Sequence, residues 1–237
     1  MMKKLLIAFL CVPWLAFASG EALHLDKAPD RSHDLPALQN GAKIFINYCL
    51  NCHSASYMRY NRLRDIGLTE QQIRDNLLFT QEKVGELMTI AMRRADAKQW
   101  FGAAPPDLTV IARARASEYG SGSDWLYTYL RSFYRDDSRP SGWNNVVFSN
   151  VAMPHVFWEL QGEQVLGPDH KLTLAKPGLM KPEEYDAMVA DLVGFLNYMG
   201  EPVQNYRKEL GVVVLIALAI LFVLAYALKR EYWKDVH

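Results

Sequence analysis

The sequence contains very little cysteine: three residues in 237, at Cys11, Cys49 and Cys52. We expect Cys11 to be removed on export with the N-terminal segment, so that the mature chain keeps only Cys49 and Cys52. No further thiol is then left for a structural disulfide, although an exported protein would be able to form one. A zinc site is also disfavoured, because it usually needs a second pair of Cys or His ligands.

The sequence also lacks an excess of charge of either sign, with 26 Lys and Arg against 26 Asp and Glu. Loss of Lys3 and Lys4 with the N-terminal segment leaves 24 basic residues against 26 acidic ones. Proteins that bind nucleic acid normally carry a strong basic patch, so we expect no nucleic acid partner. The sequence contains no internal repeat and no low-complexity tract.

The N-terminal segment has the composition of a cleaved export signal. Lys3 and Lys4 precede the apolar run Leu5–Leu15, and Ala16-Phe17-Ala18 is a small-x-small cleavage site. The apolar run is short for a membrane-spanning helix. We therefore predict a signal peptide over residues 1–18 and export of the chain that follows.

A second apolar segment, Gly211–Leu228, carries no charge. As a helix it is about 27 Å long, which matches the hydrocarbon core of a bilayer. Aromatic residues flank it, as at membrane interfaces, and Lys229 and Arg230 behind it favour a cytoplasmic C-terminus. We predict a bacterial inner-membrane protein with a signal peptide at 1–18, a periplasmic domain at 19–205, one transmembrane anchor at 206–230 and a cytoplasmic tail at 231–237.

The residues Cys49-Leu50-Asn51-Cys52-His53 form a C-x-x-C-H motif, which is typical of covalent attachment of a c-type haem. Two thiols at this spacing can each form a thioether with one porphyrin, and the His that follows can bind the iron. A thioredoxin-like redox pair is the alternative, but it normally lies in a βαβ pattern and needs no His at this position. We predict one haem c per chain, held by Cys49, Cys52 and His53, with His53 as an iron ligand.

The rest of the pattern is mainly helical. Apolar residues recur at helical spacing, and Thr69 with Gln72 matches a capping box. Two short runs on either side of Gly167-Pro168-Asp169 predict a β-hairpin. The expected fold class is a mainly α, cytochrome c-type haem domain with a small hairpin and one C-terminal transmembrane helix. The expected helices cover residues 37–48, 69–78, 83–94, 124–134 and 182–199, another helix starts at 104–107, and the hairpin strands cover 164–166 and 171–174.

Four further blocks follow the haem motif in order. The haem segment itself continues to Tyr60-Asn61-Arg62-Leu63. The four further blocks are Gly102–Leu108 with Arg113-Ala114-Arg115, Ala152-Met153-Pro154, Glu184–Pro202, and Arg207-Lys208 with Leu228-Lys229-Arg230 around the apolar span. Together with the motif, these blocks resemble the cytochrome c1 family, the haem subunit of the quinol–cytochrome c reductase (bc1) complex. The motif alone marks any cytochrome c, whereas the ordered set with a single C-terminal span is far more selective.

The sixth iron position decides the chemistry, because a Met sulfur raises the potential of a His-ligated haem and suits it to carry electrons. Met153 lies in a Pro-bounded, non-helical stretch that suits a strap across the haem, although Met is also a common packing residue. His155 is the rival ligand. The resemblance favours Met153, and it implies that Arg115 neutralises a haem propionate. Residues two apart on a helix do not share a face, so we expect Arg113 to be a solvated arginine. We also expect Pro106 to pack at the haem edge.

The resemblance implies an electron-transfer subunit of the respiratory quinol–cytochrome c reductase. Its haem accepts an electron from the Rieske iron–sulfur protein and passes it to a c-type cytochrome, with cytochrome b beside the anchor in the lipid bilayer. Cytochrome b then carries the quinol chemistry, so we expect no catalytic residue and no separate substrate-converting site here. Two alternatives stay open: a membrane-anchored, peroxidase-like haem enzyme with an open iron position, and a free-standing anchored electron shuttle.

Overall fold

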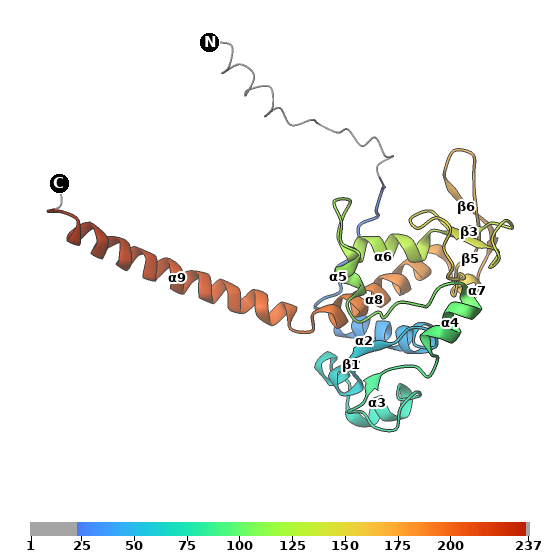
Figure 1. Ribbon diagram of the computed structural model, residues 1–237, viewed down its shortest axis with the longest axis horizontal. Helices are drawn as coiled ribbons and strands as arrows, with labels where there is room; N and C mark the ends of the chain where they lie inside the picture. The colour runs from blue at the N-terminus through green and yellow to red at the C-terminus, as the bar shows by residue number, and fades with distance from the viewer. Residues whose placement is uncertain (1–22, 236–237) are drawn as a thin grey trace, which may run out of the picture.

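The computed structural model describes residues 23–235, so the predicted signal peptide and Cys11 lie outside the described residues. Helices α2, α6 and α8 pack together at the centre of one domain, and α9 projects from it (Figure 1). The helices are α2 (Leu35–Ile44), the π-helix η1 (Phe45–Cys49), the 3-10 helix η2 (Tyr60–Ile66), α3 (Glu70–Asn76), α4 (Arg94–Phe101), α5 (Ile111–Ala114), α6 (Gly122–Arg131), α7 (Trp158–Gln161), α8 (Pro182–Gly200) and α9 (Gln204–Tyr232). The strands are β1 (Ala55–Arg59), β2 (Leu87–Met88), β3 (Phe133–Arg135), β4 (Trp143–Asn145), β5 (Gly162–Leu166) and β6 (Leu172–Pro177).

The mainly α fold with a small hairpin is confirmed. Thr69 caps α3 with the predicted capping box, in which its hydroxyl accepts from the Gln72 N–H and the Gln72 side chain accepts from the Thr69 N–H. Strands β5 and β6 form the predicted antiparallel hairpin. Two further antiparallel pairs, β1 with β2 and β3 with β4, were not predicted, because each has a strand of only two or three residues.

Helix α2 lies directly against α8 because a glycine faces the contact. A Cβ at Gly41 would lie 2.1 Å from the backbone oxygen of Asp191, so only glycine allows the two backbones this close. One turn further on, the buried rings of Phe45 and Phe195 pack with their centroids 5.7 Å apart. Helix α8 thereby fixes the position of α2, whose C-terminal end leads into the haem motif.

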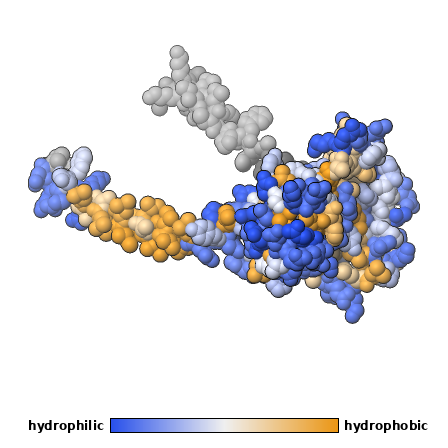
Figure 2. Space-filling view, turned by 90° about the horizontal axis from the view of Figure 1, so that it is seen from below, coloured by the Kyte–Doolittle hydropathy of each residue, from blue (hydrophilic) through white to orange (hydrophobic). Residues whose placement is uncertain are grey.

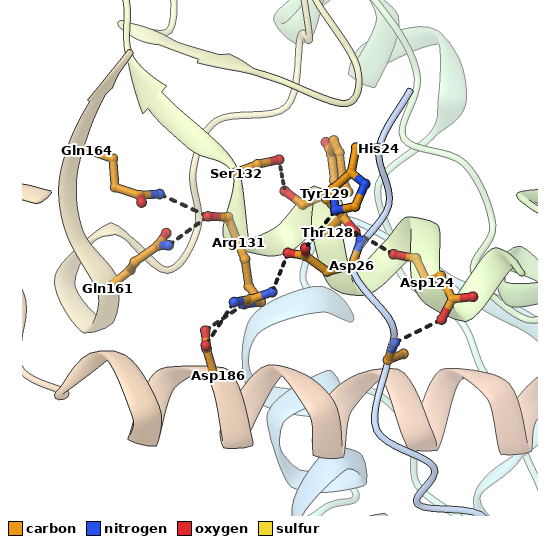
Figure 3. A network of polar contacts seen from close by, with 11 residues as sticks. His24, Asp26, Asp124, Thr128, Tyr129, Arg131, Ser132, Gln161, Gln164 and Asp186 are labelled. Atoms are coloured by element: carbon orange, nitrogen blue, oxygen red, sulfur yellow. Dashed lines mark hydrogen bonds and ion pairs between the residues drawn. The ribbon is translucent and has the colours of Figure 1, made fainter. Parts of the chain in front are cut away.

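Helix α6 is held between α8 and the N-terminal segment of the described chain by Arg131 (Figure 3). Its guanidinium donates two hydrogen bonds to the Asp186 carboxylate on α8, at 2.6 and 2.8 Å, and one to Asp26 at 2.7 Å. The backbone N–H of Asp26 in turn donates to the Thr128 hydroxyl on α6 at 2.8 Å. These bonds join three segments that are far apart in the sequence and hold α6 against α8 and the N-terminal segment.

Helix α9 contains the predicted apolar segment, and within residues 23–235 it is the one helix long and apolar enough to cross a membrane. None of its residues is buried against the domain, and Figure 2 shows it as an apolar rod with polar ends. At its start, Asn205 donates to the Ser32 carbonyl at 2.8 Å, and Arg207 is ion-paired with Glu201. The chain therefore has a membrane anchor whose base is tied to the domain.

The predicted helix over residues 83–94 is wrong. The backbone N–H groups of Tyr60 and Asn61 donate to the carbonyls of Glu86 and Val84, at 3.1 and 2.7 Å, which draws this segment alongside η2. The next residues form β2 and pair with β1. Bonds to a distant part of the chain replace the local bonds of a helix here, and helix α4 begins only at Arg94.

The predicted helix start at residues 104–107 is also wrong, since this stretch has no regular secondary structure and the short helix α5 begins at Ile111. The Asp107 carboxylate, expected at a helix N-terminus, instead accepts from the backbone N–H of Ser56 at 2.7 Å. The helix predicted over 124–134 exists as α6, but it ends at Arg131 because Phe133–Arg135 pairs with β4.

Candidate haem site

The C-x-x-C-H motif lies at the C-terminal end of α2, where the helix widens into η1. The N–H of Leu50 donates to the Phe45 carbonyl at 2.9 Å, and the N–H groups of Cys52 and His53 both donate to the Cys49 carbonyl, at 3.1 and 2.9 Å. Turns of the π type are rare and occur frequently at functional sites. Cys49 is the last residue of η1, and the turn that follows it carries Cys52 and His53.

Both cysteines are free thiols and half-buried. Burial, with a smaller contribution from the nearby Cys52, raises the pKa of the Cys49 thiol to about 12. A reactive redox cysteine needs a lowered pKa, so this environment does not suit a thioredoxin-like pair. Nor do residues 23–235 contain a group of three or more His, Cys, Asp or Glu side chains arranged to hold a metal ion, as a zinc site would require.

His53 is oriented by a hydrogen bond from its Nδ1 to the backbone oxygen of Pro106, at 2.7 Å. Burial lowers the pKa of His53 despite the opposing effects of this hydrogen bond and of Asp107, so the ring is neutral at neutral pH. A carbonyl that accepts from Nδ1–H fixes the tautomer in which Nε2 carries a free lone pair. His53 therefore has the protonation state of an iron-binding histidine, and its Nδ1 makes the hydrogen bond to a carbonyl that such a histidine normally makes.

Asp107 fixes the Pro106 carbonyl in place. One carboxylate oxygen accepts from the Ser56 N–H at 2.7 Å, and the other accepts from the N–H and hydroxyl of Thr109, at 2.8 and 2.6 Å. Pro106 itself is exposed. The structure brings Pro106 and His53 together through the backbone oxygen, whereas packing of the Pro106 ring on the haem remains a prediction.

Met153 is half-buried in a non-helical stretch, and the Tyr129 hydroxyl donates a hydrogen bond to its sulfur at 3.3 Å. His155 is only 2% exposed and lies flat on the Phe133 ring, with centroids 4.9 Å apart. Burial lowers the pKa of His155 to about 4, and its Nε2 has no hydrogen-bond partner among the described residues. The rival ligand is thus enclosed by the Phe133 and Trp143 rings, whereas the Met153 sulfur accepts a hydrogen bond from Tyr129.

Arg115 joins the group around Met153 through stacked aromatic rings. Its guanidinium lies 4.4 Å from the centroid of the Trp125 ring, and Trp125 stacks on Tyr129 at 4.8 Å with an interplanar angle of 14°. Within residues 23–235, Arg115 is paired with no carboxylate, which leaves its charge available for a propionate. Arg113 instead pairs with Glu201 at 2.9 Å, so it is an exposed structural arginine as well as a solvated one.

Three features of the site were not predicted from the sequence: the π turn, the role of Asp107 and the role of Tyr129. The π turn and the role of Asp107 depend on tertiary backbone contacts and leave no local signal. Tyr129 is one of several aromatic residues on α6, and the sequence does not indicate which of them reaches Met153.

The donor set fits a c-type haem. Two free thiols at the required spacing, a neutral His with Nε2 available, a thioether sulfur and an arginine without a carboxylate partner are the groups that such a haem uses. The bound haem supplies a one-electron couple, and the protein supplies its orientation and the tuning of its iron.

Comparisons with known proteins agree with this chemistry. The model of the Cytochrome C1 family matches residues 26–236. A Nitrosomonas europaea protein named ammonia monooxygenase gamma subunit is 54% identical, covering 100% of this chain and 99% of its own. Cytochrome c1 of Allochromatium vinosum is 49% identical over 100% of both chains. Cytochrome b/c1 of Bradyrhizobium diazoefficiens is 27% identical, covering 88% of this chain and 34% of its own. This chain therefore belongs to the cytochrome c1 family, the haem-carrying electron-transfer subunits of the bc1 complex.

Proposed function

We propose that this chain carries one haem c bound covalently through Cys49 and Cys52, and that His53 and Met153 bind its iron. The observation that carries the proposal is the hydrogen bond from His53 Nδ1 to the Pro106 oxygen, at 2.7 Å. This bond leaves the lone pair of Nε2 free to bind iron. Asp107 accepts from the Ser56 N–H and so holds the neighbouring Pro106 carbonyl in place. Within residues 23–235 the thiols of Cys49 and Cys52 form no disulfide, so both are free to bind the haem.

Electron transfer follows from the ligand pair. A neutral imidazole and a thioether favour ferrous iron relative to stronger anionic donors, so the couple lies high enough to accept electrons. We propose that the electron comes from the Rieske iron–sulfur protein and leaves to a c-type cytochrome. Cytochrome b, in the lipid bilayer beside α9, performs the quinol chemistry. This chain then needs no substrate-converting site of its own.

The remaining site residues act on the periphery of the haem. Arg115 neutralises a propionate, because its guanidinium is held by the Trp125 and Phe148 rings, at 4.4 and 5.5 Å, rather than by a carboxylate. The Pro106 carbonyl orients His53, and the ring of Pro106 packs at the haem edge. A buried propionate needs such a counter-charge, since an unpaired buried charge costs several kcal/mol.

The proposal also includes the membrane topology of the chain. Residues 1–18 are a cleaved signal peptide, and residues 19–205 are a periplasmic haem domain. Residues 206–230 are the anchor in the bacterial inner membrane and residues 231–237 are a cytoplasmic tail. Support comes from the exposed apolar surface of α9 and from the basic residues in its last turn, Lys229 and Arg230, which favour a cytoplasmic end.

Covalent attachment is tested with the double variant Cys49→Ala/Cys52→Ala, produced in cells that attach haem to c-type cytochromes normally. We expect the full-length chain to lose all haem that survives denaturing electrophoresis. Asn51→Ala is the matched control, because Asn51 lies between the cysteines and bonds only the exposed Asn47 carbonyl. Haem that stays bound to the denatured double variant would refute attachment through this pair.

The name of the Nitrosomonas relative favours a second candidate, a subunit of an ammonia monooxygenase assembly. Purification of the tagged chain in mild detergent separates the possibilities. Cytochrome b and an iron–sulfur protein in the purified complex support the bc1 function, and a monooxygenase subunit supports the second candidate. A haem-loaded chain that purifies alone would indicate a free-standing shuttle. A peroxidase-like enzyme would instead be recognised by an open iron position, without a sulfur ligand.

A further inference from the structure

We propose that Tyr129 is a positioning residue for the axial sulfur, and that its hydrogen bond to Met153 raises the reduction potential of the haem. The inference deepens the proposed function and rests on Met153 as the iron ligand. It adds a residue that lies outside the haem motif and outside the strap that contains Met153.

The donor and acceptor are in place in the protein itself. The Tyr129 hydroxyl lies 3.3 Å from the Met153 sulfur, and Tyr129 is only 8% exposed. Burial raises the pKa of Tyr129 and the positive charge of Arg115 only partly opposes this, so the phenol stays protonated at any physiological pH. Tyr129 is therefore placed to donate a hydrogen bond to this sulfur.

The hydroxyl has little freedom to turn elsewhere, because the ring is fixed on both sides. Trp125 stacks on it at 4.8 Å and Phe133 packs edge-on at 5.1 Å. The backbone oxygen of Tyr129 accepts from the Asn145 side chain at 2.8 Å. The network drawn in Figure 3 holds the same helix through Arg131. A hydroxyl held in this way keeps its position against the sulfur when the iron changes oxidation state.

The sign of the effect follows from the two lone pairs of a thioether sulfur. One accepts from Tyr129, and the other remains for the iron. The O–H draws electron density from the sulfur and places a partial positive charge near the iron. Both effects destabilise ferric iron more than ferrous iron, because ferric iron depends more on donation and carries the larger charge. The hydrogen bond therefore raises the potential.

The test is Tyr129→Phe, which removes one oxygen and keeps the ring between Trp125 and Phe133. We expect this holoprotein to fold and to keep its covalent haem. The ferric-to-ferrous equilibrium should fall by about three- to tenfold, the larger value being 59 mV for one electron. The weak far-red sulfur-to-iron band should shift, because sulfur donates more strongly to ferric iron. Both are measured by potentiometric titration of the purified full-length chain.

Tyr127→Phe is the matched control, since Tyr127 lies on the same helix, is similarly buried and contacts Arg131 rather than Met153. Its potential and far-red band should equal those of the wild type. Met153→Leu separates the inference from the proposed function, because it should abolish the band. If Met153→Leu loses the band while Tyr129→Phe matches the control, the role of Tyr129 is refuted and Met153 stands as the ligand. If Met153→Leu keeps the band, both are overturned.

Discussion

Replacing Asp107 with Asn changes the support of His53 without changing the volume of the side chain. The two carboxylate oxygens of Asp107 divide three hydrogen bonds: one accepts from the Ser56 N–H, and the other accepts from the N–H and hydroxyl of Thr109. An Asn side chain has a single acceptor oxygen. If that oxygen keeps the two bonds from Thr109, the amide NH₂ faces the Ser56 N–H and one donor loses its partner.

The cost follows from that loss. A hydrogen bond to a charged group contributes about 1.5–3 kcal/mol, so Asp107→Asn should lower the free energy of unfolding by about 2 kcal/mol. Asp107→Ala removes all three bonds and should cost about 4 kcal/mol, since the two backbone donors it leaves are only partly reached by water. The Pro106 carbonyl then moves relative to His53, so this proposed iron ligand loses its fixed orientation.

The assay is urea unfolding of the detergent-solubilised chain, followed by far-UV circular dichroism. Asp75→Asn is the control, because Asp75 is exposed and accepts only from Gln71 one turn away. The control should stay within about 0.5 kcal/mol of the wild type. If Asp107→Asn and Asp75→Asn have the same stability, the carboxylate does not support the segment from Pro106 to Thr109.

The same carboxylate predicts a pH dependence. Burial raises the pKa of Asp107, but the hydrogen bonds from Thr109 and Ser56 outweigh it and hold the pKa below its ordinary value. A lowered folded-state pKa gives stability that is complete above the unfolded pKa of about 3.9 and is lost as the pH falls through the folded value. The wild type should therefore lose stability below about pH 4 more steeply than Asp107→Asn does. Parallel acid-unfolding curves would contradict this.

Three further predictions concern the framework. Gly41→Val should lower the free energy of unfolding in urea by about 3 kcal/mol, because its Cβ would lie 2.1 Å from the Asp191 oxygen. An unchanged midpoint of urea unfolding would show that α2 and α8 can move apart at no cost. Arg131→Met should cost about 1–2 kcal/mol in the same assay, because it leaves the Asp186 carboxylate without its two hydrogen bonds; a more stable variant would contradict this. Truncation after Asn205 should release a folded, haem-containing domain into the soluble fraction, since α9 is the one membrane-length helix in residues 23–235, and persistent membrane association would refute a single anchor.

Elements with a strong local signal were predictable from the sequence. The capping residues of α3, the turn between β5 and β6, and the long apolar run in α9 each determine their structure within one segment. The helix prediction for residues 83–94 was wrong because Tyr60 and Asn61, from another part of the chain, donate backbone hydrogen bonds to this segment. Such bonds override helix propensity and are not visible in the segment itself.

The residues of the candidate site also fall into those that the sequence identifies and those that only the fold brings together. Covalent attachment of a haem requires a fixed spacing of the two cysteines and the histidine, so the motif at residues 49–53 could be identified from the sequence. Asp107 was expected at a helix N-terminus, because Pro-Pro-Asp is a common helix-start pattern, and its actual partner Ser56 is distant in sequence. Tyr129 was one aromatic residue among several on α6, and only the fold shows that its hydroxyl contacts Met153.

The most direct test of the whole account is whether quinol reduces the haem on this chain. In membranes that contain the wild-type chain, addition of quinol should reduce the haem, and addition of an oxidised c-type cytochrome should reoxidise it. In Met153→Leu membranes the covalent haem should remain, but quinol should leave it largely oxidised, because loss of the thioether lowers the potential. A wild-type haem that stays oxidised with quinol, or a Met153→Leu haem reduced as fully as the wild type, would contradict the account.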